Sequence, residues 1–112
     1  MGPQRHGYFA GKGGAAILTR RIGIENSKKG IRGNVVSVGY AEGPLVDRAI
    51  AQGGADAEKV NANRASNVPR GAQILPSEVA NVAAFLSSDV SSAINATEVF
   101  ADGGNHNVTY GP

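Results

Sequence analysis

Only two segments of this chain have the composition of β-strands, and a segment with helical character precedes each of them. Residues 31–38 contain Val35-Val36 and Val38, as expected of a buried parallel strand. Residues 97–101 form the second segment. The order helix, strand, insert, helix, strand is typical of a parallel α/β sheet. Because two strands are too few to complete such a sheet, the sequence predicts part of a larger α/β fold.

The first predicted helix spans residues 8–29 and carries apolar residues on two sides. One stripe contains Ala15, Leu18 and Ile22, and a second contains Ile17 and Ile24. Two stripes indicate a helix covered on more than one side, by its own domain and by a partner subunit. Lys28-Lys29 and Gly30 are residue types that suit the end of a helix.

A variable region and a second well-defined helix follow the first strand. Residues 40–75 are interpreted as a mobile insert or lid, with a short helix over 43–52 and weak helical character around 56–66. Residues 76–87 are predicted to be helical, with Pro76 in the first turn. One face of that helix is apolar: Val79, Val82, Ala83 and Leu86.

Composition narrows the class of protein. The 112 residues suffice for one domain. The net charge is only +2 and the basic residues are dispersed, and both observations argue against nucleic acid as a partner and against a small basic binding protein. The chain has no cysteine, no apolar run of membrane-spanning length and no secretory signal at its start. We therefore expect no membrane association and a cytoplasmic location. His6 and His106 lack metal-ligand spacing, so no metal site is predicted.

Tyr8 and Lys12 are four residues apart on a predicted helix and therefore share one face. A free tyrosine has a pKa near 10, too high for acid/base work at neutral pH, and a nearby ammonium lowers it. A tyrosine tuned in this way can exchange a proton with an alcohol or a carbonyl oxygen. By itself the spacing is a weak signal, because a solvated lysine beside a half-buried tyrosine is common.

The surrounding residues make the signal specific, because the chain resembles the C-terminal half of a classical short-chain dehydrogenase/reductase. The spacing from Tyr8 to Asn34 matches the active-site helix and following strand of that family without a gap. The residues that carry the resemblance are Tyr8-Phe9-Ala10-Gly11-Lys12-Gly13-Gly14, Leu18-Thr19-Arg20, Glu25, Lys29-Gly30-Ile31-Arg32-Gly33-Asn34, Gly39-Tyr40, Glu42, Pro44-Leu45, Pro69, Gly71, Pro76, Glu78-Val79-Ala80-Asn81, Ala84-Phe85-Leu86-Ser87-Ser88-Asp89 and Asp102-Gly103-Gly104.

The resemblance implies the C-terminal part of a Rossmann-type doubly wound parallel sheet, incomplete, with about two strands and three to four helices. Residues 1–112 would be a partial NAD(P)-binding domain with a lid over about 43–68. It further implies hydride transfer between a small-molecule alcohol and a carbonyl, with NAD or NADP as cofactor. Tyr8 would be the general acid/base, and Lys12 would lower the tyrosine pKa and bind the nicotinamide ribose. The cofactor-binding residues would be Tyr8, Lys12, Val38, Gly39, Ala41 and Gly43.

Several positions depart from the family pattern. Val38 stands where proline is usual, Gly43 where threonine is usual, and Ala96 where glycine is common. Gly33 replaces a usual valine, which we expect to weaken the first strand. Leu75 replaces a helix-capping residue such as threonine.

Two functions remain open from the sequence. The family's phosphate-binding glycine-rich turn and its catalytic serine and asparagine lie upstream of the tyrosine that Tyr8 matches. The chain is therefore interpreted as part of a short-chain oxidoreductase, with homo-oligomer formation through helix 8–29. The alternative is a truncated, catalytically inactive fragment that acts as a self-associating module.

Overall fold

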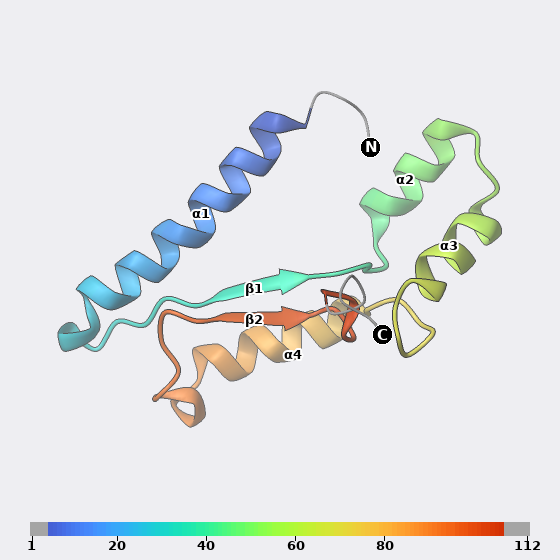
Figure 1. Cartoon of the computed structure of the whole chain (residues 1–112). Helices are drawn as coiled ribbons and strands as arrows, with labels where there is room; N and C mark the ends of the chain where they lie inside the picture. The colour runs from blue at the N-terminus through green and yellow to red at the C-terminus, as the bar shows by residue number, and fades with distance from the viewer. Residues whose placement is uncertain (1–4, 107–112) are drawn as a thin grey trace. The chain divides into compact units, whose positions relative to one another are not determined.

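The computed structural model describes residues 5–106, which form four α-helices, two short 3-10 helices and two strands (Figure 1). The helices are α1 (His6–Glu25), α2 (Pro44–Gly53), α3 (Ala57–Ser66) and α4 (Pro76–Ser87), and the 3-10 helices are η1 (Ser27–Lys29) and η2 (Asp89–Ser91). The strands β1 (Val35–Val38) and β2 (Glu98–Ala101) pair in a two-stranded parallel sheet. The predicted α/β architecture is thereby confirmed.

The register of the sheet is fixed by backbone hydrogen bonds at both ends. The Val35 N–H donates to the Thr97 carbonyl at 2.9 Å, and the Gly39 N–H donates to the Ala101 carbonyl at 3.3 Å. The chain divides into two compact units. The first contains the described residues up to Val35 together with 86–99, and the second contains 36–85 and the described residues from 100 onward.

In the first unit, α1 packs against the segment before β1 by close backbone approach. A Cβ atom on Gly33 would lie within 3.0 Å of the Thr19 carbonyl oxygen, and one on Gly23 would lie 2.8 Å from the Gly33 nitrogen. Asn95 links the two segments, because its Oδ1 accepts from the Gly33 N–H and its Nδ2 donates to the Gly23 carbonyl, each at 3.0 Å. Gly33 lies outside β1, so its expected role as a weak point in a strand is wrong. A glycine is needed there for packing.

The second unit contains most of the buried apolar side chains. Val68 and Ile74 are 1% and 3% exposed, and Ile50 of α2 is also buried. The predicted turn after β2 closes over this core: Gly103 has a φ of 63°, and a Cβ there would lie 2.6 Å from Val68 Cγ1. Both its backbone conformation and its packing therefore favour glycine at this position.

Several element boundaries differ from the sequence-based expectations. The first strand covers only the second half of the predicted range 31–38, because the Gly33 N–H donates to Asn95 and its carbonyl accepts from Ala96. The helix predicted over 8–29 ends at Glu25 and continues as η1, with Gly30 in the left-handed conformation at its end.

The region between the strands contains helices where the sequence indicated them, and the last helix is as predicted. The insert contains α2 and α3, and Asp56 caps α3 by accepting from the Glu58 and Lys59 N–H groups. The α4 helix has the predicted bounds. The predicted apolar face of α4 is confirmed for Leu86, which is buried, but Ala83 is exposed.

Candidate functional site

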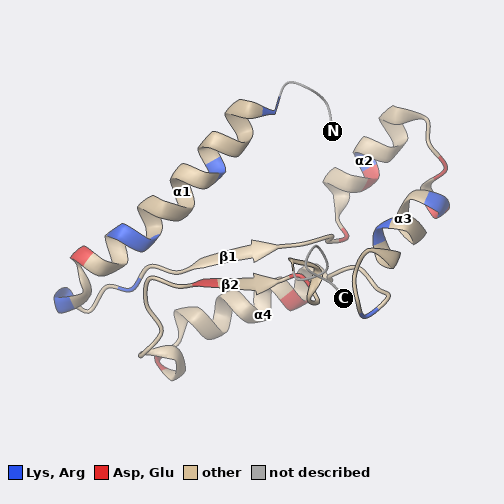
Figure 2. Ribbon diagram, in the orientation of Figure 1, with Lys and Arg blue, Asp and Glu red and all other residues tan. Residues whose placement is uncertain are grey.

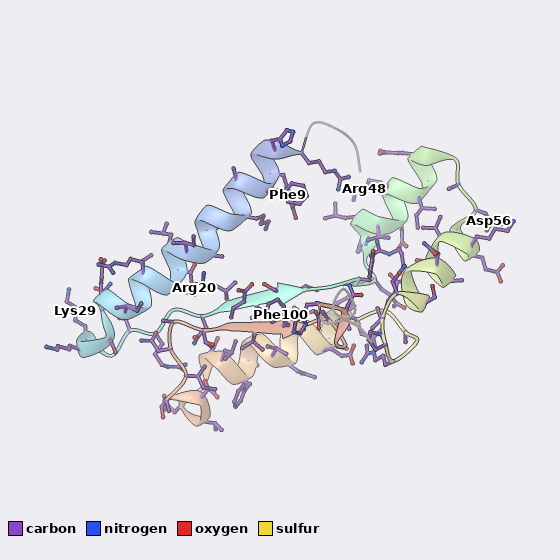
Figure 3. All side chains as sticks on the ribbon, in the orientation of Figure 1. Phe9, Arg20, Lys29, Arg48, Asp56 and Phe100 are labelled. Atoms are coloured by element: carbon purple, nitrogen blue, oxygen red, sulfur yellow. The ribbon has the colours of Figure 1, made fainter. Side chains whose placement is uncertain are left out.

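Tyr8 and Lys12 lie one turn apart on α1, in the first unit. The Lys12 Nζ is 5.9 Å from the centroid of the Tyr8 ring, within the range of a cation–π contact. The Tyr8 ring also packs edge-on against Phe9, at 5.6 Å between centroids and 74° between planes. Tyr8 is 59% exposed, and Phe9 projects from the same helix (Figure 3). The helix thus places a phenol and an ammonium side by side and accessible.

The face of α1 that packs within the first unit is built from small and polar residues. Gly23 is buried, and Ala16, Thr19 and Arg20 are partly buried. The predicted apolar stripes are instead exposed: Ile17, Leu18, Ile22 and Ile24. The expected cover of these stripes by the rest of the domain and by a partner subunit stays a prediction, because the described residues leave the stripes exposed. On the packed face, the close backbone approach at Gly23 and Gly33 leaves no room for branched side chains.

The other predicted cofactor-binding residues, Val38, Gly39, Ala41 and Gly43, lie in the second unit between β1 and α2. Gly39 touches the turn after β2, because a Cβ at residue 39 would lie 2.6 Å from the Asp102 Cβ. Val38 is 43% exposed at the end of β1. This segment is therefore held by close backbone contact at Gly39.

Ala41 forms a parallel β-bridge with Ile74. The Ile74 N–H donates to the Tyr40 carbonyl at 2.8 Å, and the Glu42 N–H donates to the Ile74 carbonyl at 3.0 Å. In a trans peptide the N–H and C=O point to opposite sides. The N–H and C=O of Ala41 therefore both face away from Ile74. Within residues 5–106 the Ala41 N–H donates to no acceptor.

Gly43 is the N-cap residue of α2, and no side chain caps that helix start. Its φ of 162° is extended backbone, and a Cβ there would meet no atom within 4 Å. The threonine expected from the family pattern would therefore fit at this position.

A polar cluster in the second unit was not anticipated from the sequence. Arg64 of α3 donates from Nε to Gln73 Oε1 at 2.8 Å and from Nη2 to the Ala41 carbonyl at 3.0 Å. Gln73 is only 6% exposed and donates to Asn61 at 3.1 Å. The Arg64 guanidinium carbon is 5.0 Å from the centroid of the Tyr40 ring. Arg64 and Ala41 are 23 positions apart and the cluster follows no motif, so only the fold reveals it.

Asp102 organises the turn that follows β2. Its carboxylate accepts from the Gly104 and His106 N–H groups at 2.9 Å, and from His106 Nδ1 at 2.6 Å. Burial opposes ionisation of this carboxyl, but the hydrogen bonds from His106 and Gly104 outweigh it and lower the pKa of Asp102. The His106 ring stacks on Phe100 at 4.0 Å. His106 is exposed, and its contacts to Asp102 and Phe100 make it part of this turn.

Lysine and arginine are distributed over several helices and loops (Figure 2). None of the helices in residues 5–106 combines the length and apolarity required to cross a bilayer. Over the same residues, no group of three acidic or histidine side chains could hold a metal ion.

The chain is similar to oxidoreductases in sequence. The profile of the family described as enoyl-(acyl carrier protein) reductase matches residues 1–106. An uncharacterised oxidoreductase, YxbG of Bacillus subtilis, is 40% identical over 103 residues, which are 89% of this chain and 37% of the relative. Cis-4-hydroxycyclohexanecarboxylate dehydrogenase of Sinomonas cyclohexanicum is 40% identical over 97 residues, covering 87% of this chain and 36% of that enzyme. The chain thus spans little more than a third of the length of these curated relatives.

Solved structures show the same similarity. A C-terminal deletion mutant of Thermoplasma acidophilum aldohexose dehydrogenase superposes with a TM-score of 0.84 at 27% identity, over 92% of this chain and 46% of that one. A variant of actinorhodin polyketide ketoreductase, solved with NADPH, gives a TM-score of 0.80 at 29% identity, over 89% of this chain and 40% of that one. With the family profile matching from residue 1 to residue 106, the chain belongs to the short-chain dehydrogenase/reductase family of oxidoreductases.

Proposed function

We propose that this chain carries the acid/base pair and part of the cofactor site of an NAD(P)-dependent enzyme that interconverts a small-molecule alcohol and a carbonyl. The observation that carries the proposal is the placement of Tyr8 and Lys12, accessible and one turn apart on α1. The similarity to oxidoreductases, among them an alcohol-acting dehydrogenase and a ketoreductase solved with NADPH, supports this chemistry.

Tyr8 would exchange a proton with the substrate oxygen, as donor in the reductive direction and as acceptor in the oxidative one. The Lys12 ammonium would stabilise negative charge on the Tyr8 oxygen and donate hydrogen bonds to the ribose hydroxyls. Helices α2 and α3, which cover most of residues 43–68, would form the lid over the substrate.

The segment from Val38 to Gly43 offers a fit for the nicotinamide end of the cofactor. The partly buried Ala41 N–H has no acceptor among the described residues, and a carboxamide oxygen would supply one. The residues that would hold the nicotinamide nucleotide are Tyr8, Lys12, Val38, Gly39, Ala41 and Gly43. When bound, NAD(P) would donate or accept the hydride.

Fluorescence titration with NADH and NADPH tests the cofactor site directly. We expect the purified chain to change the emission of one of them saturably, and Lys12→Met to weaken that binding while Lys29→Met does not. Lys29 is an exposed lysine of η1 (Figure 3) and serves as the matched control. Tyr8→Phe should spare binding and abolish turnover. No saturable change with either nucleotide up to millimolar concentration would contradict the proposal.

A second function, self-association without cofactor, is favoured by the exposed apolar residues of α1. Ile17 and Leu18 are 63% and 60% exposed. Side chains of this kind favour burial against a second surface, such as another copy of the helix. In analytical ultracentrifugation, Leu18→Glu should shift the chain toward monomer, whereas Leu45→Glu on the exposed face of α2 should not. A wild-type chain that stays monomeric at high concentration would rule out the module.

A further inference from the structure

Arg64 joins α3 to two other segments of the second unit, at Ala41 and at Gln73. It projects from the last turn of α3, and its guanidinium reaches the Ala41 carbonyl and the Gln73 side chain at the same time. It also lies 5.0 Å from the Tyr40 ring centroid. Gln73 is held in turn by its own hydrogen bond to Asn61 of α3. The planar guanidinium, with its fixed fork of donors, suits such a bridge better than a lysine ammonium would.

The peptide groups around Ala41 show what this bridge controls. On one side of the segment, the Tyr40 carbonyl and the Glu42 N–H are bonded to Ile74. On the opposite side, the Ala41 carbonyl is bonded to Arg64, and the Ala41 N–H lies on that same side. Arg64 therefore fixes the peptide plane next to the N–H group that the proposed function assigns to the nicotinamide carboxamide.

We propose that Arg64 is a positioning residue, which ties lid helix α3 to the Tyr40–Glu42 segment and so holds in place the segment that presents the Ala41 N–H to the cofactor. The inference rests on the proposed function for its cofactor side only. The tie itself consists of two hydrogen bonds and a ring contact within the described chain. One consequence is that a movement of α3 over the substrate would also move the Tyr40–Glu42 segment, which would lie beside the nicotinamide.

Amide hydrogen exchange of the full chain tests the tie without any cofactor. Arg64→Met keeps a long side chain and removes the guanidinium, and we expect the Glu42 and Ile74 amides to exchange about tenfold faster or more. Arg64→Lys should behave like Arg64→Met, because one ammonium cannot replace the fork. Arg48→Met is the matched control, since Arg48 is exposed on α2 (Figure 3) and donates to no described residue.

The pattern of exchange separates a positioning role from a general structural one. A positioning role predicts faster exchange at Glu42 and Ile74 with unchanged exchange at Val60 and Gly71, whose N–H groups bond to Asp56 and Val68. Equal acceleration at all four amides, or none at Glu42 and Ile74, would overturn the inference.

A second experiment measures the binding of NADPH and NADH to the same variants by fluorescence. Arg64→Met should weaken binding about tenfold relative to Arg48→Met, in line with the loss of one charged hydrogen bond. Unchanged binding together with faster exchange at Glu42 would refute the positioning role. If the wild-type chain binds neither nucleotide, the proposed function fails, and the exchange pattern alone still decides whether Arg64 ties α3 to this segment.

Discussion

Replacing Gly33 by alanine tests the packing that holds α1 in the first unit. The new Cβ would lie within 3.0 Å of the Thr19 carbonyl oxygen and 3.2 Å from the Gly23 nitrogen. Both atoms belong to the helix backbone, so neither can rotate away. Residue 33 cannot retreat easily either, because its N–H donates to Asn95 and its carbonyl accepts from Ala96. Overpacking of this kind costs about 1–3 kcal/mol, and we expect about 2 kcal/mol for alanine and more for valine.

Urea and thermal unfolding followed by circular dichroism measure this cost, which corresponds to about 8 °C in Tm at about 4 °C per kcal/mol. The matched control is Gly14→Ala in the middle of α1, where an added Cβ meets no atom within 4 Å. Alanine there should stabilise the chain by about 0.5–1 kcal/mol through helix propensity. The two substitutions are chemically identical, so a destabilisation confined to Gly33→Ala is expected only if the new methyl group meets the backbone of α1. If Gly33→Ala is as stable as the wild type, the close approach of α1 to residue 33 does not exist in solution.

Three further predictions concern stability. Ala96 has a φ of 55°, the left-handed region, so Ala96→Gly should stabilise the chain by about 1 kcal/mol in urea unfolding; a loss would show that the residue is not strained. The hydrogen bonds from Arg70 and from the Leu75 N–H lower the pKa of Glu78 to about 2. The stabilising contribution of ionised Glu78 is therefore complete above the ordinary pKa of 4.5 and is lost as the pH falls toward 2. Glu78→Gln removes this contribution, so it should reduce the difference between the urea midpoints measured at about pH 6 and about pH 3. Asp102→Ala removes the acceptor of the Gly104 N–H in the turn after β2, so it should lower the free energy of unfolding by about 1–3 kcal/mol; an unchanged urea midpoint would contradict that role.

Some features of the fold are local and could be predicted from the sequence. The α4 helix begins at Pro76 and has the expected bounds, because its start and its apolar spacing lie within one short segment. Glu78 also accepts from the Leu75 N–H, which partly replaces the capping residue missing at Leu75. The β-branched residues of β1 and the glycines of the turn after β2 are equally local signals.

One part of the candidate site could likewise be predicted from the sequence, and another part could not. The spacing of Tyr8 and Lys12 placed them on one face of a helix, and the structure has them there. Whether the pair acts on a proton stays a prediction. The position of Arg64 beside the Ala41 carbonyl could not be read from a polar helix without a motif, because the contact joins residues 23 positions apart.

What the sequence by itself determined is the family, the order of the elements and the pairing of Tyr8 with Lys12, since all three depend on residue types at fixed spacings along the chain. Only the tertiary structure decided which face of α1 is packed. Apolar periodicity favoured the stripes of leucine and isoleucine, but the backbone contact at Gly23 and Gly33 excludes side chains of that size. Small residues therefore form this packed face, because two backbones that approach so closely leave no space for larger side chains.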